Sequence, residues 1–349
     1  MPFQIIRNDI TKVKADAIVN TANPKPRIGR GTDSAIYAAA GKERLLARRK
    51  EIGELAPGQA ASTDAFDLDA KYILHTVGPV WVDGSHGEGV ILRSCYAESL
   101  ALADKLRCRS VAFPLIASGA YGFPKDEALN IALSEIGRFL LTHEMKILLV
   151  VFDRKALELS ENLMGSVEQY IDDHTARSLR EQEYGSTDME MIRRRGQMQT
   201  ERLPSFWNDG PSIAASSGIG PLPPAPGMTL EEVLQKGGKS FQQRLFELID
   251  ERKLDDVTVY KRANISRKVF SSIRCKPDYR PRKRTAVAFG IALGLDMPTM
   301  ADLLSRAGFA LSPSDTFDLI ISYFITNRVY DVDKINVVLF NYGLPLLGC

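Results

Sequence analysis

Short apolar runs and longer helix-length segments alternate over the first half of the chain. Strands are predicted over residues 3–6, 17–20, 59–63, 72–77, 110–117 and 146–152, and helices over 34–40, 45–49, 91–106, 125–141 and 155–171. Strands that are separated by helix-length segments are typical of a mixed sheet with helices on both faces. Residues 110–116 and 147–152 are almost continuously apolar, which predicts two central, buried strands.

The pattern changes after about residue 175. Residues 176–227 end in a Pro/Gly/Ser-rich stretch that cannot bury much surface, which predicts a linker. From residue 228 onward every segment has helical spacing, with helices expected over 240–252, 257–263, 267–274, 285–293, 300–307, 314–326 and 332–340. The chain is therefore divided into an N-terminal domain (1–175), a linker (176–227) and an all-α domain (228–349).

Composition agrees with this division. A chain of 349 residues, 25% charged and 44% hydrophobic, is typical of a soluble protein with two domains. No apolar run approaches the roughly 20 residues of a membrane span, and no signal peptide is visible. The four cysteines lack CxxC spacing, which favours a reducing cytoplasm over a disulfide scaffold or a metal site.

The most informative stretch follows the second predicted strand. Asn20 and Asn23 stand at the strand end, a loop interrupted by Gly29 and Gly31 follows, and Asp33 stands at the start of an Ala-rich helix. A strand end, a flexible loop and a helix N-terminus together can bind phosphate through backbone N–H groups. The two amides can bond ribose hydroxyls, and the carboxylate can orient a water. The stretch predicts a site for a nucleotide diphosphate.

This stretch is one of several motifs that occur in order over residues 1–172. They are residues 8–11, 16–23, 29–36, 40–41, 57–60, 72–79 and 112–124. Together they resemble the macrodomain family. The resemblance implies a three-layer α/β/α fold with a mixed central sheet and a site for ADP-ribose, with no further cofactor.

The resemblance also assigns roles to individual residues. Asp9 and the backbone of Ile10 correspond to the adenine contacts, Asn23 to an amide near the distal ribose, and Phe152 to an aromatic ring against adenine. The two phosphate loops correspond to Gly29, Arg30 and Gly31, and to Ser118, Gly119, Ala120, Tyr121 and Gly122. From the residues alone, Asp33 can instead cap a helix, and Phe152 and His75 can be core residues.

In the hydrolytic branch of the family, an aspartate at the position of Asp33 is implicated, with the Asn23 amide, in activating water. The implied reaction is hydrolysis of a mono-ADP-ribosyl group or of O-acetyl-ADP-ribose. Ile28 and Arg30 interrupt a loop that is usually a run of glycines. The alternative is therefore a non-catalytic reader of ADP-ribose or a ligand-sensing DNA-binding regulator, in a defence or toxin–antitoxin system.

A second constellation lies at residues 259–274, which resemble the helix-turn-helix of phage repressors of the Cro/C1 type. Asn264 suits the left-handed turn, and Ser266 is expected to cap the second helix. Residues 239–284 hold 14 Lys and Arg against 6 Asp and Glu. The predicted nucleic-acid contacts are Arg267, Lys268, Ser271 and Ser272 on the second helix, and Arg274, Lys276, Arg282, Lys283 and Arg284 to phosphates.

The expected partners follow from the two constellations. The first predicts ADP-ribose or an ADP-ribosylated macromolecule. The second predicts DNA or, because small helical domains of this pattern also bind proteins, a protein partner. The apolar segment 317–340 can either extend the core or form the face of a homodimer. No membrane contact is expected.

Overall fold

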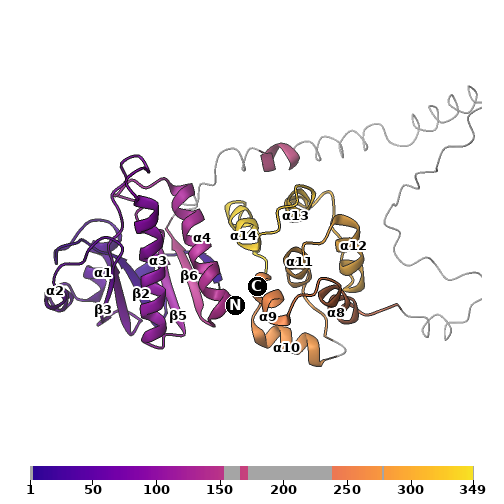
Figure 1. Cartoon of the computed structure of the whole chain (residues 1–349), viewed down its shortest axis with the longest axis horizontal. Coiled ribbons are helices and arrows are strands. Elements are labelled where there is room, and N and C mark those ends of the chain that lie inside the picture. The colour runs from indigo at the N-terminus through magenta and orange to yellow at the C-terminus, as the bar shows by residue number, and fades with distance from the viewer. Residues whose placement is uncertain (1–2, 153–165, 172–237, 277–278, 349) are drawn as a thin grey trace, which may run out of the picture.

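The computed structural model describes residues 3–152, 166–171, 238–276 and 279–348. We call residues 3–152 the α/β region and residues 238–348 the helical region, and Figure 1 shows the two side by side. The predicted linker at 176–227 and most of the predicted helix at 155–171 lie outside the described residues. Within the described residues, no helix is both long enough and apolar enough to span a membrane.

One six-stranded sheet forms the centre of the α/β region. Its strands are β1 (Phe3–Arg7), β2 (Ala17–Thr21), β3 (Ala60–Asp64), β4 (Tyr72–Thr76), β5 (Ser110–Pro114) and β6 (Lys146–Val151). Their order is β1-β6-β5-β2-β4-β3, and all neighbours are parallel except β3 and β4. The predicted mixed sheet is confirmed, and the two apolar runs form the adjacent inner strands β5 and β6.

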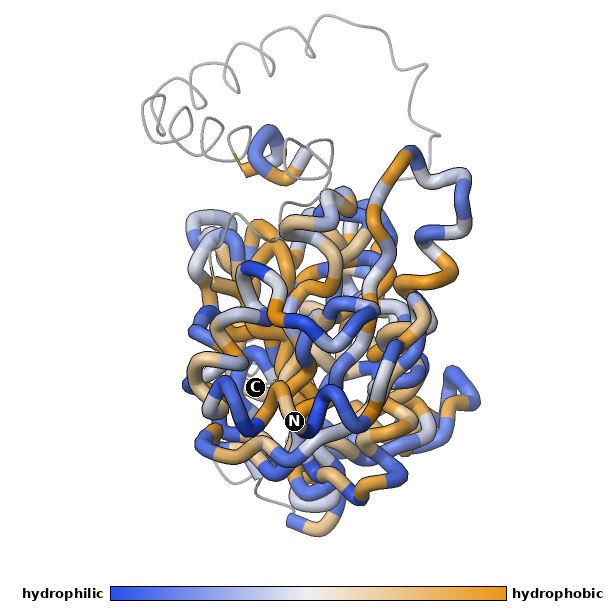
Figure 2. Tube along the Cα trace, turned by 90° about the vertical axis from the view of Figure 1, so that its left-hand side faces the viewer, coloured by the Kyte–Doolittle hydropathy of each residue, from blue (hydrophilic) through white to orange (hydrophobic). Residues whose placement is uncertain are grey.

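Helices cover both faces of this sheet. On one face α1 (Thr32–Ala40) and α2 (Lys42–Ile52), with the short 3-10 helix Ile10–Lys12, enclose one buried apolar cluster. On the other, α3 (Glu88–Lys105) and α4 (Lys125–Thr142) enclose a second, which continues into the helical region. Figure 2 shows hydrophobic and hydrophilic stretches alternating along the chain. A two-sided core leaves the ends of the parallel strands as the open edge where a ligand can bind.

Seven helices are described in the helical region. They are α8 (Phe241–Glu251), α9 (Asp256–Arg262), α10 (Arg267–Cys275), α11 (Lys283–Ala292), α12 (Met297–Arg306), α13 (Thr316–Thr326) and α14 (Val332–Asn341). Six of these begin at a Ser or Asp whose side chain accepts a backbone N–H of the first turn. Such caps supply partners for N–H groups that the helix itself leaves free, and they explain the short connections.

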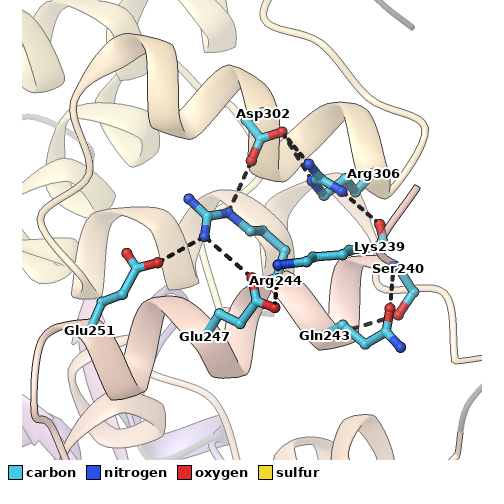
Figure 3. Close-up of polar contacts among 8 residues, drawn as sticks. All are labelled: Lys239, Ser240, Gln243, Arg244, Glu247, Glu251, Asp302 and Arg306. Atoms are coloured by element: carbon cyan, nitrogen blue, oxygen red, sulfur yellow. Dashed lines mark hydrogen bonds and ion pairs between the residues drawn. The ribbon is translucent and has the colours of Figure 1, made fainter.

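Charged side chains join α8 to α12. The Arg244 guanidinium contacts Asp302 at 3.1 Å, Glu247 at 3.4 Å and Glu251 at 3.0 Å (Figure 3). Arg306 binds Asp302 and donates to the backbone oxygen of Lys239 at 2.8 Å. These cations are paired within the region, so they serve its packing.

The helical region docks on the edge strand β1 through the turn between α9 and α10. Asn264, in the left-handed conformation with φ of 52°, accepts from Phe3 N at 3.1 Å and donates to Phe3 O at 2.8 Å. Its carboxamide thus bonds both backbone groups of Phe3, as a residue of a neighbouring strand would. Tyr260 Oη donates to the Glu144 carboxylate at 3.1 Å, and Lys261 Nζ donates to Leu141 O at 3.0 Å.

Candidate functional site

A cavity of about 710 Å³ opens where β2, β5 and β6 end. Three segments supply its walls, namely the loop into α1, the loop after β5 and the end of β6. The lining residues are Thr21, Asn23, Arg27–Asp33, Gly78, Pro114, Leu115, Ala117–Tyr121 and Val150–Phe152. A cleft at the carboxyl ends of parallel strands is the usual ligand site of an open α/β sheet.

Asn23, Gly29 and Asp33 form one corner of this cavity. Gly29 N donates to Asp33 Oδ2 at 2.5 Å, and Asn23 Nδ2 donates to Arg27 O at 3.3 Å. A Cβ at residue 29 would lie 2.6 Å from Asn23 Nδ2 and 3.1 Å from Asp33 Oδ2, closer than packing allows. Any side chain at this position would therefore have to displace Asn23 or Asp33, because these two polar side chains close over the backbone of Gly29.

Asp33 is buried although it lines the cavity. Its Oδ1 accepts from Asn20 Nδ2 at 2.6 Å, and Oδ2 accepts from Gly29 N. Burial raises the pKa of Asp33, while these two hydrogen bonds and the positive charge of Arg49 oppose the rise. A carboxylate offers about four acceptor positions, so lone pairs remain for a water in the cavity. The alternative role as a helix cap is not seen, since the carboxylate bonds the loop before α1.

Arg49 on α2 was not among the predicted site residues. Its side chain is fully buried, and the guanidinium donates to the backbone oxygens of Asn23 at 3.1 Å, Pro24 at 3.3 Å and Gly53. It thereby fixes the segment that carries Asn23 and places a positive charge near Asp33. Arg44 and Arg48 on the same helix are exposed, so no local signal distinguishes Arg49.

The second predicted phosphate loop lies opposite this corner. Ser118, Gly119, Ala120 and Tyr121 line the cavity, whereas Gly122 does not and instead closes the turn by donating to Gly119 O at 2.9 Å. Ser118 Oγ donates to Leu115 O at 2.9 Å. Arg30 and Gly31 of the first loop line the same cavity. The structure therefore brings both predicted loops to one site.

Of the predicted adenine contacts, Phe152 lines the cavity, whereas Asp9 and Ile10 do not. Phe152 lines it with 81% of its surface exposed, so it is not a core residue and its ring is open to stacking. Asp9 lies outside the lining set, and its carboxylate accepts from Thr11 N at 2.9 Å and caps the 3-10 helix. Ile10 is buried. Asn8 N donates to Val151 O at 3.1 Å, which brings this segment beside the end of β6.

Asn20 and His75 lie below the cavity rather than in it. Both are fully buried, and Asn20 Nδ2 lies 3.1 Å from His75 Nδ1. Asn20 thus contacts Asp33 and not the open space, so its predicted contact with the ligand has no counterpart among the lining residues. His75 has partners on both ring nitrogens, as expected of a buried core histidine.

Comparison with known proteins identifies the α/β region. The family model described as Macro domain matches residues 19–132. A macro domain-containing protein of Methanosarcina mazei is 46% identical over 143 residues, which are 41% of this chain and 76% of that protein. The chain belongs to the macro domain family. We therefore call the α/β region the macro domain, and the predicted resemblance is confirmed for this part.

Two further proteins are similar to the macro domain. A Klebsiella pneumoniae protein named O-acetyl-ADP-ribose deacetylase is 42% identical over 169 residues, which are 47% of this chain and 96% of that protein. A macrodomain of Oceanobacillus iheyensis, solved with ADP, is 36% identical over 44% of this chain and 85% of that chain, with a TM-score of 0.42. These similarities leave more than half of the present chain uncovered.

The predicted nucleic-acid residues lie outside the macro domain and fall into two groups. Exposed side chains are Arg267, Lys268, Ser271, Lys276 and Arg282, and Ser272 is half-buried and donates to Lys268 O. Three cations have partners within the chain: Arg274 pairs with Asp256, Lys283 with Asp318 at 2.6 Å, and Arg284 donates to Leu346 O at 3.4 Å. The helix-turn-helix assignment itself remains a prediction.

One cluster of metal-ligand side chains occurs among the described residues, in the loop before α3 and at the first residue of that helix. Its members, Asp83, His86 and Glu88, have ligand atoms within 4.8 Å of one another. The Glu88 carboxylate, however, accepts backbone N–H groups of Val82, Gly84 and His86 at 2.7–3.3 Å. These hydrogen bonds order the loop and account for the cluster without a metal.

Proposed function

We propose that the macro domain binds ADP-ribose and hydrolyses a mono-ADP-ribosyl ester or O-acetyl-ADP-ribose. The observation that carries the proposal is the corner of Asn23 and Asp33 in a cavity that also holds two backbone loops and an exposed aromatic ring. The name of the Klebsiella pneumoniae relative supports the same ester chemistry. The loops anchor the pyrophosphate, and Phe152 stacks on the adenine.

In this mechanism Asp33 is the catalytic base. Its free lone pairs hold a water, and the carboxylate takes a proton as the water attacks the carbonyl carbon of the ester. The C–O bond to the ribose oxygen then breaks, and Asp33 returns the proton to that departing oxygen, which leaves a free carboxylic acid and ADP-ribose. Asn23 orients the distal ribose or the water. The fixed geometry supplies orientation, because both Asp33 oxygens are already bonded to the protein and cannot rotate away.

The test compares Asp33→Ala with Asp64→Ala, a variant of an exposed carboxylate on β3. Release of ADP-ribose or acetate is measured together with ADP-ribose binding by calorimetry. We expect Asp33→Ala to lose about 100- to 10,000-fold in kcat and to retain ADP-ribose binding. Asp64→Ala should match the wild type. A fully active Asp33→Ala variant would remove this mechanism, and a wild type that binds without turnover would establish a reader.

The pH dependence provides a second readout of Asp33. Its pKa lies above the ordinary value of 3.8, so the carboxylate form is lost as the pH falls through that raised value. Turnover should therefore decline on the acid side at a higher pH than an exposed aspartate would give. No such acid limb should appear in the residual activity of Asp33→Ala.

We also propose that the exposed basic face of the helical region binds nucleic acid. Arg267 and Lys268 at the start of α10 support this role, because they face solvent next to Ser271. Such a face gives salt-dependent affinity for phosphates without sequence preference. The paired cations Arg274, Lys283 and Arg284 contribute less to it.

A further inference from the structure

A chain of buried hydrogen bonds runs from Asp33 into the sheet. Asn20 Nδ2 donates to Asp33 Oδ1 at 2.6 Å and lies 3.1 Å from His75 Nδ1. His75 Nε2 lies 3.0 Å from Thr63 Oγ1. All four residues are less than 5% exposed. The chain connects the helix α1 with three neighbouring strands, β2, β4 and β3.

Strand register brings these side chains together. Asn20 and His75 are direct partners in the parallel pair of β2 and β4, so their side chains leave the same face of the sheet. Thr63 is on β3, which runs antiparallel to β4 and places Ala61 opposite His75. Side chains two residues apart share a face, and this places the Thr63 hydroxyl beside the ring.

The direction of each hydrogen bond follows from the chemistry of Asn20. Its Nδ2 carries two hydrogens, and the two acceptors near it are Asp33 Oδ1 and His75 Nδ1. His75 Nδ1 must therefore be the unprotonated nitrogen, so Nε2 carries the proton and donates to Thr63 Oγ1. Burial lowers the pKa of His75 to about 3, so the ring stays neutral and Nδ1 stays an acceptor at neutral pH.

The amide of Asn20 has no other anchor in the described structure. Its Oδ1 is buried and has no hydrogen-bond partner there. The orientation of the amide is consequently fixed by the two acceptors on its nitrogen. Without His75 only the hydrogen bond to Asp33 Oδ1 holds the amide, so the amide is less firmly oriented and this hydrogen bond is weaker.

We propose that His75 is a positioning residue for Asp33, acting through the amide of Asn20, with Thr63 fixing the tautomer of the ring. The inference rests on the proposed hydrolysis for its effect on turnover, although its structural part stands without it. Other groups that face Asp33 are Gly29 N from the loop, Tyr37 on α1, Arg49 on α2 and Tyr121 after β5. None of these contacts Asn20 Nδ2 in place of His75.

The test uses two substitutions of different chemistry at one buried site. His75→Asn keeps an amide oxygen near the position of Nδ1, whereas His75→Leu fills the space without an acceptor. In the full chain, the carboxyl carbon of Asp33 is followed by NMR as the pH is changed, and kcat and KM are measured over the same range. ADP-ribose binding serves as the measure of an intact cavity.

We expect His75→Leu to raise the titration midpoint of Asp33 by up to about one pH unit, since the hydrogen bond from Asn20 to the carboxylate is weakened. The acid limb of kcat should shift equally, kcat at low pH should fall by up to about tenfold, and KM should stay near that of the wild type. His75→Asn should restore most of both values. Thr63→Val, which removes only the outer hydroxyl, should give a smaller shift in the same direction.

Two results would overturn the proposal. One is an unchanged midpoint of Asp33 in both His75→Leu and Thr63→Val, and the other is equal impairment by His75→Asn and His75→Leu, which indicates packing alone. If His75→Leu does not fold, Thr63→Val and His75→Asn still decide the question. If the wild type shows no turnover, the proposed hydrolysis fails while the NMR titration still tests the positioning of Asp33.

Discussion

Buried polar side chains serve different ends in the macro domain and in the helical region. In the macro domain, Asn20 bonds the carboxylate of Asp33, which lines the cavity, and Arg49 bonds the backbone of the loop that carries Asn23. In the helical region, Asn336 bonds Leu347 N and O, and Asn264 bonds Phe3 N and O. Those two amides bond only backbone groups, and neither lines the cavity of the macro domain.

The comparison shows where burial indicates chemistry. Burying a polar group is costly unless it finds partners, so each such group requires a reason. The burial of an amide that bonds two backbone groups is explained by its contribution to the fold. The fold does not explain the burial of a carboxylate that lies at a cavity wall and can still accept hydrogen bonds. Such a carboxylate indicates a ligand.

In the macro domain, we expect Gly29→Val to cause a large loss of turnover. The new side chain must displace Asn23 or Asp33, because even a Cβ would lie 2.6 Å from Asn23 Nδ2. Displacing a catalytic group by about 1 Å costs about 100-fold in rate. We expect at least that loss in ADP-ribose release, with weaker ADP-ribose binding by calorimetry.

Gly89→Ala is the matched control for Gly29→Val. Gly89 lies in α3, and the nearest atom to a Cβ there is Ile131 Cδ1 at 3.9 Å. This change should leave turnover unaltered and stabilise the helix by less than about 1 kcal/mol, because Gly89 lies in the first turn and not in the helix interior. A Gly29→Val variant that is as active as Gly89→Ala would show that the corner of Asn23 and Asp33 is not the reacting site.

In the helical region, we expect Asn264→Gly to destabilise the full chain without changing the cavity. Glycine adopts the φ of 52° freely, so only the two bonds to Phe3 are lost. Each orphaned buried backbone group costs about 1–3 kcal/mol, so two of them predict about 2–6 kcal/mol in chemical denaturation. ADP-ribose affinity should not change.

Asn327→Ala controls for the loss of an amide at the surface. Asn327 is exposed and bonds only Tyr323 O in the preceding turn, so we expect about 0.5 kcal/mol or less. If Asn264→Gly is no more destabilising than Asn327→Ala, the edge of β1 is stabilised by its apolar contacts rather than by the carboxamide. Hydrogen exchange at Phe3 N would show which of the two holds.

The sequence predicted the sheet, the two loops and Asp33 because these depend on local signals. A strand that ends in amides, a loop with glycines and a helix start are all visible within residues 17–40. Ser266 as a cap and Asn264 in the left-handed turn were predicted for the same reason, and both are confirmed.

Arg49, His75 and the docking of Asn264 depend on contacts that no local pattern contains. Arg49 stands among other arginines of one charged helix, and only tertiary packing buries it. The partner of Asn264 is 261 residues away in the chain. Similarly, charge counting predicted Lys283 as a phosphate contact, but its pairing with Asp318 depends on how α11 packs near α13.

The smallest expected effect concerns the basic face of α10. If Arg267 and Lys268 each contact a phosphate, replacing both by Ser lowers the slope of log affinity against log salt by about 2, since each contact contributes about 0.9. Anisotropy with a fluorescent DNA duplex over a salt series measures this slope.

Lys12→Ser with Lys14→Ser removes the same charge from the macro domain and should change the slope less. Equal slopes for the two double variants, or no DNA binding by the wild type, would show that exposed cations on α10 do not form a nucleic-acid site. The helical region would then differ from the macro domain in having only an architectural role among the residues compared.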